Sequence, residues 1–177
     1  MKRTRQIDTP KIKQDRKLDC GIAALRMVSR YFGKDISAKE IIKKVGGIKK
    51  FGVRAIELAD FAKNIGFKVE CYSFNKKLAR GKAKIKPPEK ADILKFLNKK
   101  IPVIIAVRSW ILYNKRPSKM GHFIVITDHK DGKFSYNDPK DGKKHQINEE
   151  KLMFAWHAHI EDSSAYLLAI KAKKRKK

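Results

Sequence analysis

The spacing of apolar residues changes near residue 66, and this change restricts the possible folds more than any other feature of the sequence. In the first third of the chain, apolar residues recur at intervals of three and four, the period of a helix that packs one face on a core. Beyond it, short apolar runs are separated by turn residues, a pattern typical of strands. Because helices precede strands instead of alternating with them, we expect an α+β protein with an antiparallel sheet.

Three helices are predicted before residue 66, and their ends carry recognisable signals. The first begins after Asp19, a candidate N-cap, and runs to Phe32. The second begins with a capping box, Ser37 to Glu40, and the third spans about residues 53–65. A glycine follows each helix, as expected where the chain turns out of the helical path.

The rest of the chain contains candidate strands and further helices. Strands are predicted at residues 68–74, 101–107, 122–127, 134–138 and 165–170, and helices at about residues 91–98 and 148–156. Asp131-Gly132, between two of these strands, predicts a hairpin turn. Residues 75–89 are basic and contain Pro87-Pro88, which predicts a loop that crosses between two lobes.

A chain of 177 residues is long enough for one domain with a substantial core. We predict a single domain at residues 12–171, with a helical lobe at about 18–66 packed on a sheet lobe at about 101–171. Residues 1–11 are predicted to be a basic N-terminal segment, and residues 172–177 a basic tail.

The chain carries 44 Lys and Arg against 18 Asp and Glu, a net charge of +26. A field of this size attracts polyanions such as nucleic acids and anionic membrane surfaces. The basic residues, however, are mostly lysines spread along the whole chain, without the arginine and aromatic clusters of a single-strand binding surface. The charge therefore predicts solubility and weak, nonspecific polyanion binding.

The sequence also predicts the cellular compartment and the absence of bound metals. No apolar run reaches the roughly 18 residues of a transmembrane helix, and no apolar segment follows the basic N-terminus as it would in a secretory signal. Cys20 and Cys71 do not make a disulfide framework, so we expect a cytoplasmic protein with both thiols reduced. His157 and His159 lack a third ligand at a suitable spacing, and no metal or cofactor is predicted.

Cys20 lies at the predicted start of the first helix. A thiol there faces unpaired backbone N–H groups and the positive end of the helix dipole, both of which favour the thiolate. Gln14, six residues upstream, carries an amide that can donate a hydrogen bond to a developing oxyanion. The segment is therefore a candidate half of a cysteine-nucleophile active site.

A cysteine nucleophile needs a base, and five histidines compete for that role. His122 opens an apolar strand directly after Gly121, which gives the imidazole a rigid position with an open approach. The other four are predicted in less suitable places, namely His129 at a hairpin turn, His145 in a lysine-rich loop, and His157 and His159 on either side of Ala158. His122 is thus the preferred base by position.

Asp138 is the candidate that orients the base, and its role depends on the hairpin. If the turn comprises residues 128–132, the strand register places Asp138 opposite His122. A two-residue turn at Asp131-Gly132 would instead place it opposite Val125. A triad therefore requires the wider turn or a bulge, and Asp138 equally fits a plain turn at the end of a strand.

Five segments together resemble a known family. They are Gln14 with Asp19 to Val28, Tyr31-Phe32-Gly33, Ile101 to Ile104, Gly121 to Ile126, and Asn137-Asp138-Pro139 with Gly142. In kind and order they are similar to the bacteriocin-processing, double-glycine cysteine peptidases, a papain-like family, and to their stand-alone relatives. The likeness covers roughly residues 12–171.

The resemblance implies a papain-like fold, with an N-terminal helical lobe packed on a C-terminal antiparallel sheet. It also implies that Cys20 is the nucleophile, that His122 is the base oriented by Asp138, and that Gln14 lies in the oxyanion hole. Transporter-linked members of the family cut leader peptides after a Gly-Gly pair. Because no ATP-binding or membrane domain accompanies this sequence, the catalytic chemistry carries over better than the substrate does.

Three functions compete on these grounds. The first is a thiol peptidase for a peptide or protein substrate, cutting after small residues such as Gly-Gly. The second is an acyltransferase, which passes the same acyl-enzyme to an amine or thiol. The third is a papain-like binding module that uses its charge to hold nucleic acid or an acidic partner. The set of Gln14, Cys20, His122 and Asp138 favours an enzyme, but it serves hydrolysis and transfer alike.

Overall fold

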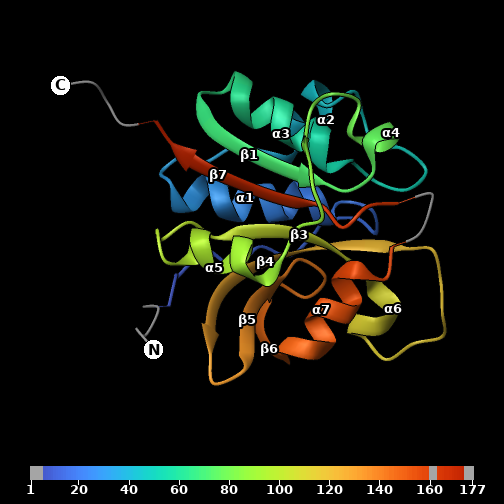
Figure 1. Cartoon of the computed structure of the whole chain (residues 1–177). Helices are drawn as coiled ribbons and strands as arrows, with labels where there is room; N and C mark the ends of the chain where they lie inside the picture. Colours follow the sequence, from blue (N-terminus) through green and yellow to red (C-terminus); the bar gives the residue numbers. More distant parts are fainter. Residues whose placement is uncertain (1–5, 160–162, 174–177) are drawn as a thin grey trace.

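The computed structural model describes residues 6–159 and 163–173 of the chain. Its centre is a seven-stranded sheet in the order β2-β1-β7-β3-β4-β5-β6 (Figure 1). The strands are β1 Phe67–Ser73, β2 Lys84–Ile85, β3 Val103–Arg108, β4 Gly121–Lys130, β5 Lys133–Asp138, β6 Lys143–Asn148 and β7 Leu167–Ala172. Neighbouring strands are antiparallel except for β1 and β2, which are parallel.

Helices cover both faces of the sheet, and the sheet separates two hydrophobic cores. One core contains α1 Cys20–Tyr31, α2 Ala38–Lys44 and α3 Ala55–Asn64, and the other contains α5 Lys90–Leu97, α6 Ser109–Leu112 and α7 Glu149–His157. In Figure 1, α2 and α3 lie beside β1, and α6 and α7 lie on the opposite side of β3. This arrangement confirms the predicted α+β class. Among the described residues, no helix has the length and apolar character needed to cross a membrane.

Strand β3 is apolar throughout because it is covered on both sides. Ile104 and Ala106 pack in the first core, and Val103, Ile105 and Val107 pack in the second. Successive side chains of a strand point to opposite faces, so a strand between two layers of helices buries every residue. As predicted, β3 is a central strand, flanked by β7 and β4.

The helices predicted in the first third of the chain are confirmed, with small differences at their ends. One half of the predicted capping box is present, since the Ser37 hydroxyl accepts a hydrogen bond from the Glu40 backbone N–H at 3.1 Å. Asp19 occupies the N-cap position of α1, but its side chain makes no capping hydrogen bond. The position of this cap was predictable, whereas the orientation of its side chain was not.

Two predicted loops are wrong. Residues 75–89 contain β2 and also α4 Lys76–Ala79, which is capped by the Asn75 side chain through a hydrogen bond from the Leu78 N–H at 3.0 Å. His145 lies on β6, not in a loop. As an edge strand, β6 pairs with β5 through its backbone and buries only Ile147, so it lacks the apolar pattern that reveals a strand.

The hairpin between β4 and β5 combines a tight turn with a bulge. Asp131 and Gly132 have φ values of 49° and 70°, as a two-residue type I′ turn requires, and Lys130 pairs with Lys133 across it. Of the two turns that the sequence left open, the two-residue turn is therefore the one present. The register shifts between Ile126 and Asp128, so Thr127 is an additional residue in β4.

Residues 7–14, here called the N-terminal strap, run along the ends of β4 and β5. The Ile7 N–H donates to the Thr127 carbonyl at 3.1 Å, and the buried Asn137 side chain donates to the Thr9 hydroxyl at 2.7 Å. Farther along, the Gln14 N–H donates to the Pro139 carbonyl at 2.7 Å. Ile7 and Thr9 are themselves buried, so the strap is packed into the structure.

Replacing Phe134 by alanine should lower the free energy of unfolding by about 3–5 kcal/mol, because it leaves a cavity in the second core. Phe134 is fully buried, whereas Phe51 is 71 % exposed. The matched control Phe51→Ala should therefore stay within about 0.5 kcal/mol of the unmodified protein. Urea unfolding followed by circular dichroism measures both values, and equal losses would contradict the assignment of this core.

Candidate active site

Cys20 is the first residue of α1, and its side chain is partly exposed. The first turn of this helix contains no acidic residue that would offset its positive end. Gly21 allows the start of the helix to approach β4, because a Cβ atom at this position would lie 3.1 Å from both Leu58 and Phe123. The thiol is thus held next to the first residues of β4.

His122 is the second residue of β4 and is 8 % exposed. Its Nε2 atom lies 2.7 Å from Oδ1 of Asp138. Burial favours the neutral imidazole, but the hydrogen bonds with Asp138 and with the Cys20 side chain outweigh it and raise the pKa of His122 to about 9. The imidazole is therefore paired with the predicted orienting group, and it lies close enough to the predicted nucleophile for Cys20 to influence its pKa.

The Asp138 carboxylate is buried and accepts hydrogen bonds from three donors. Oδ1 accepts from His122 and from the Lys140 backbone N–H at 2.8 Å, and Oδ2 accepts from the Tyr113 hydroxyl at 2.7 Å. Burial by itself would raise the pKa of Asp138, but these partners lower it below its ordinary value. A charged Asp138 is consequently favoured beside His122.

The bulge in β4 determines which side of the sheet Asp138 faces. Beyond the bulge, Val125 pairs with Asn137, so Asp138 aligns with Ile124. Ile124 and His122 lie two residues apart on the same face, so Asp138 contacts His122 diagonally and not from the directly opposite position that a five-residue turn would give. Without the shift, Asp138 would align with Val125 and its side chain would point to the other face.

Tyr113, which follows α6, is a site residue that the sequence did not reveal. Besides donating to Asp138, its ring lies 5.7 Å from the His122 ring, centroid to centroid. The Lys140 ammonium lies 3.7 Å from the centre of the tyrosine ring, within range of a cation–π contact. Tyr113 holds the second carboxylate oxygen of Asp138. Nothing in the spacing of the loop around Tyr113 pointed to this contact.

Gln14 lies in the loop that leads to α1, and its backbone is bound to the turn after Asp138 through Pro139. Its side-chain amide, however, donates to the Arg16 carbonyl at 2.6 Å. The amide oxygen Oε1 is buried and has no hydrogen-bond partner within the described parts of the chain. Gln14 is thus attached through its backbone to the turn that follows Asp138, and its role in the oxyanion hole stays a prediction.

A cleft of about 230 Å³ opens beside the thiol. Its lining includes Cys20 and His122 together with Phe51, Arg54, Lys119 and Met120. The cleft lies where the start of α1, the start of β4 and the segment before α3 meet. A chain threaded through it would pass the thiol and the imidazole together.

The other four histidines have other partners. His129 pairs with Glu149 at 2.9 Å, His145 with Asp141 at 2.8 Å, His157 with the Pro88 carbonyl at 2.8 Å, and His159 with the Ala106 carbonyl at 3.0 Å. His159 also lines the cleft, where its Nδ1 atom lies 2.6 Å from the Ser163 hydroxyl. Among the described residues, His122 is the histidine that pairs with Asp138.

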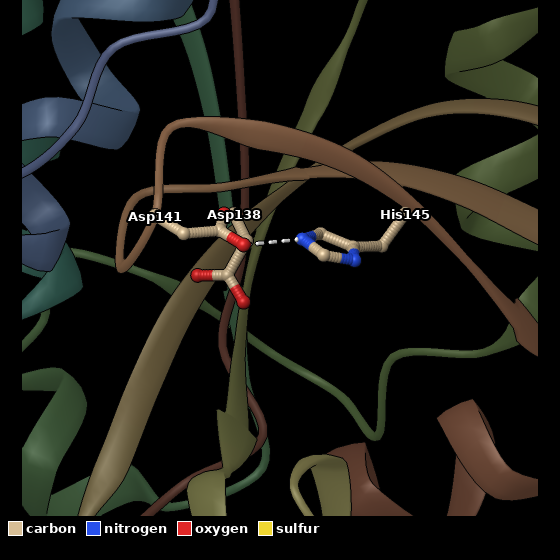
Figure 2. A group of neighbouring side chains, drawn as sticks. All are labelled: Asp138, Asp141 and His145. Atoms are coloured by element: carbon tan, nitrogen blue, oxygen red, sulfur yellow. Dashed lines mark hydrogen bonds and ion pairs between the residues drawn. The ribbon is translucent and has the colours of Figure 1, made fainter.

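Asp138, Asp141 and His145 form a group whose ligand atoms lie within 4.8 Å of one another (Figure 2). Such a group has the composition of a cation site. The oxygens of Asp138, however, already accept from His122, Tyr113 and the Lys140 N–H. A cation placed here would compete with the His122 contact, so we treat the group as part of the support of Asp138.

Cys71, the second thiol, is unsuited to nucleophilic chemistry. It lies in β1 and is 6 % exposed. Burial raises the pKa of its thiol to about 12. As predicted, Cys71 is a buried residue of a strand.

Three solved structures share this fold. The peptidase domain of Streptococcus ComA, a bi-functional ABC transporter involved in quorum sensing, has a TM-score of 0.68 at 17 % identity and covers 94 % of this chain and 100 % of that chain. A C39-like peptidase from Bacillus anthracis has a TM-score of 0.66 at 14 % identity, with 94 % and 96 % covered. A double glycine motif protease from an AMS/PCAT transporter, in complex with the leader peptide, has a TM-score of 0.60 at 22 % identity, with 95 % and 94 % covered.

At these identities the likeness establishes the fold, which confirms the papain-like architecture predicted from the sequence. No protein with a curated description matches the sequence. The model of the peptidase C39 family, by contrast, matches residues 8–160, which is most of the chain. The chain therefore belongs to the peptidase C39 family of cysteine peptidases.

Proposed function

We propose that the protein hydrolyses peptide bonds with Cys20 as nucleophile, His122 as general base and acid, and Asp138 as the residue that orients His122. The observation that carries this proposal is the 2.7 Å contact between His122 and Asp138 beside a cleft that Cys20 lines. A nucleophile, a base and an orienting group in this sequence of contacts form a catalytic triad.

In this mechanism the Cys20 thiolate attacks the carbonyl carbon of the scissile bond, and the carbonyl oxygen gains negative charge. Protonated His122 then donates its proton to the leaving amine as the C–N bond breaks. Water, deprotonated by His122, attacks the resulting thioester and releases the second product and the free thiolate. Asp138 holds the ring through Nε2, which leaves Nδ1 for these proton transfers.

The developing oxyanion requires hydrogen-bond donors at the start of α1. The Cys20 backbone N–H is one, because the first N–H groups of a helix have no partner within it. We assign the second to the Gln14 amide, which would leave the Arg16 carbonyl when substrate binds. This assignment is supported by the backbone hydrogen bond from Gln14 to Pro139, the residue that follows Asp138.

The substrate class is a peptide. A double glycine motif protease with this fold has been solved in complex with a leader peptide. We propose that this protein also cleaves its peptide substrate after small residues such as a Gly-Gly pair.

Cys20 should react with iodoacetamide far faster than Cys71 in the folded protein, because Cys20 is partly exposed at a helix start and Cys71 is buried. Peptide mass spectrometry of timed samples measures both rates. Cys20→Ala should remove peptide cleavage and this labelling together. Equal labelling of the two thiols before unfolding would contradict the nucleophile assignment.

The rate constant kcat/KM should fall as the pH rises through about 9, because His122 loses the proton that the leaving amine needs. The sign follows from the raised pKa, which keeps the imidazole charged below this pH. In Asp138→Asn, the hydrogen bond that raises the pKa of His122 is weakened, so the fall should begin at lower pH. A value of kcat/KM that stays constant well above pH 9 would contradict the role of His122. A fall that occurs at the same pH in Asp138→Asn would contradict the coupling between Asp138 and His122.

Gln14→Ala should lower kcat by roughly 10²–10³-fold, the typical loss for one oxyanion donor. The labelling rate of Cys20 should change little, since that reaction develops no oxyanion. The Gln14 N–H bond to Pro139 is a backbone contact and survives the substitution, so the strap should stay in place. Unchanged turnover in Gln14→Ala would refute the role of the amide.

A further inference from the structure

The charged side chains that line the cleft are all basic within the described residues. Arg54 and Lys119 carry permanent positive charge there, alongside His122 and His159, and no Asp or Glu lines the cleft. An excess of positive charge over the whole chain does not explain this by itself, since acidic residues lie nearby on α3. The charge of the cleft therefore depends on whether the acids of α3 neutralise its basic residues.

The acids of α3 are paired with lysines and do not neutralise Arg54. Glu57 accepts the Arg54 backbone N–H at 3.0 Å and pairs with the Lys49 ammonium at 2.6 Å. Asp60 pairs with Lys82. The guanidinium of Arg54 is thus left without a carboxylate among the residues that the structure describes.

One nitrogen of Arg54, Nη1, is buried and has no hydrogen-bond partner in the described part of the chain. A buried donor without a partner is unfavourable, and more so when it is charged. A carboxylate is the group that satisfies a guanidinium best, because two parallel N–H···O bonds match its geometry. The Arg54 guanidinium lines the cleft without a carboxylate partner among the described residues, so it is suited to bind an acidic group of a ligand.

We infer that the cleft selects peptides with an aspartate or glutamate near the scissile bond, and that Arg54 binds this carboxylate. The inference rests on the proposed function, because it places the acidic residue in the peptide that Cys20 attacks. Phe51, 71 % exposed at the rim, offers an apolar surface to the neighbouring part of the same peptide. Arg54 thus acts as a specificity residue, separate from the triad.

The general field of the protein is the alternative explanation for any preference for acidic peptides. The net charge of +26 attracts every anion, but salt screens such long-range attraction, with a Debye length of about 3 Å at 1 M ionic strength. A direct contact between a carboxylate and a partly buried guanidinium is screened far less. Salt therefore separates the two causes.

The experiment compares pairs of short Gly-Gly peptides that differ only in carrying Glu or Gln at one flanking position. Each pair tests a different position along the peptide. We expect the unmodified protein to cleave the best Glu peptide with kcat/KM roughly 10-fold or more above its Gln partner. Arg54→Gln should reduce this ratio to about one. The control Lys50→Gln removes the same charge from a residue outside the cleft lining and should keep the ratio.

The affinity of the same peptides for Cys20→Ala, by fluorescence anisotropy, tests the inference without turnover. A Glu preference in binding that disappears in the Cys20→Ala, Arg54→Gln double variant supports it even if no peptide is cleaved, in which case the proposed function alone fails. Cleavage of Glu and Gln peptides at equal rates overturns the inference and leaves the peptidase intact. A preference that Arg54→Gln and Lys50→Gln reduce equally also overturns it.

A measurement on the unmodified protein guards against misfolding of Arg54→Gln. The Glu preference should persist when the salt concentration is raised to about 1 M, where the general field is screened. Its disappearance at this salt would assign the preference to net charge and overturn the role of Arg54.

Discussion

The Asp138 carboxylate accepts hydrogen bonds from three donors, and the position and charge of the other active-site groups follow from them. Burial of an acid favours its neutral form, which would give His122 no stable partner. The donors from His122, Tyr113 and Lys140 reverse this preference and lower the pKa of Asp138. The charged carboxylate then helps to keep His122 protonated next to Cys20. Each partner comes from a different segment, so the site forms only when β4, the segment after α6 and the turn after β5 come together.

The sequence predicted those parts of the site that depend on local structure. The position of Cys20 follows from the start of α1, which is visible in the helical period and in Asp19 before it. His122 was preferred because it follows Gly121 at the start of an apolar run, and it does lie at the start of β4. Both inferences needed only the order of residues within one element.

The remaining parts depend on contacts between elements, which spacing alone does not determine. The sequence left open whether a wide turn or a bulge brings Asp138 to His122, and the bulge at Thr127 is what sets the face on which Asp138 lies. Asp138 contacts His122 diagonally, because of a register between β4 and β5 that residue propensities do not determine. The contact of Tyr113 with Asp138 and the edge strand β6 were missed for the same reason.

The N-terminal strap also determines when the site can form during synthesis of the chain. Thr9 and its partner Asn137 are 128 positions apart, and Gln14 is bound to Pro139 at a similar separation. Contacts of such range form late, because the intervening chain must be ordered first. A nascent chain that has exposed Cys20 still lacks His122, Asp138 and the turn that holds the strap. The thiol therefore meets His122, its proposed base, only after most of the domain has left the ribosome, and the proposed hydrolysis begins with the finished fold.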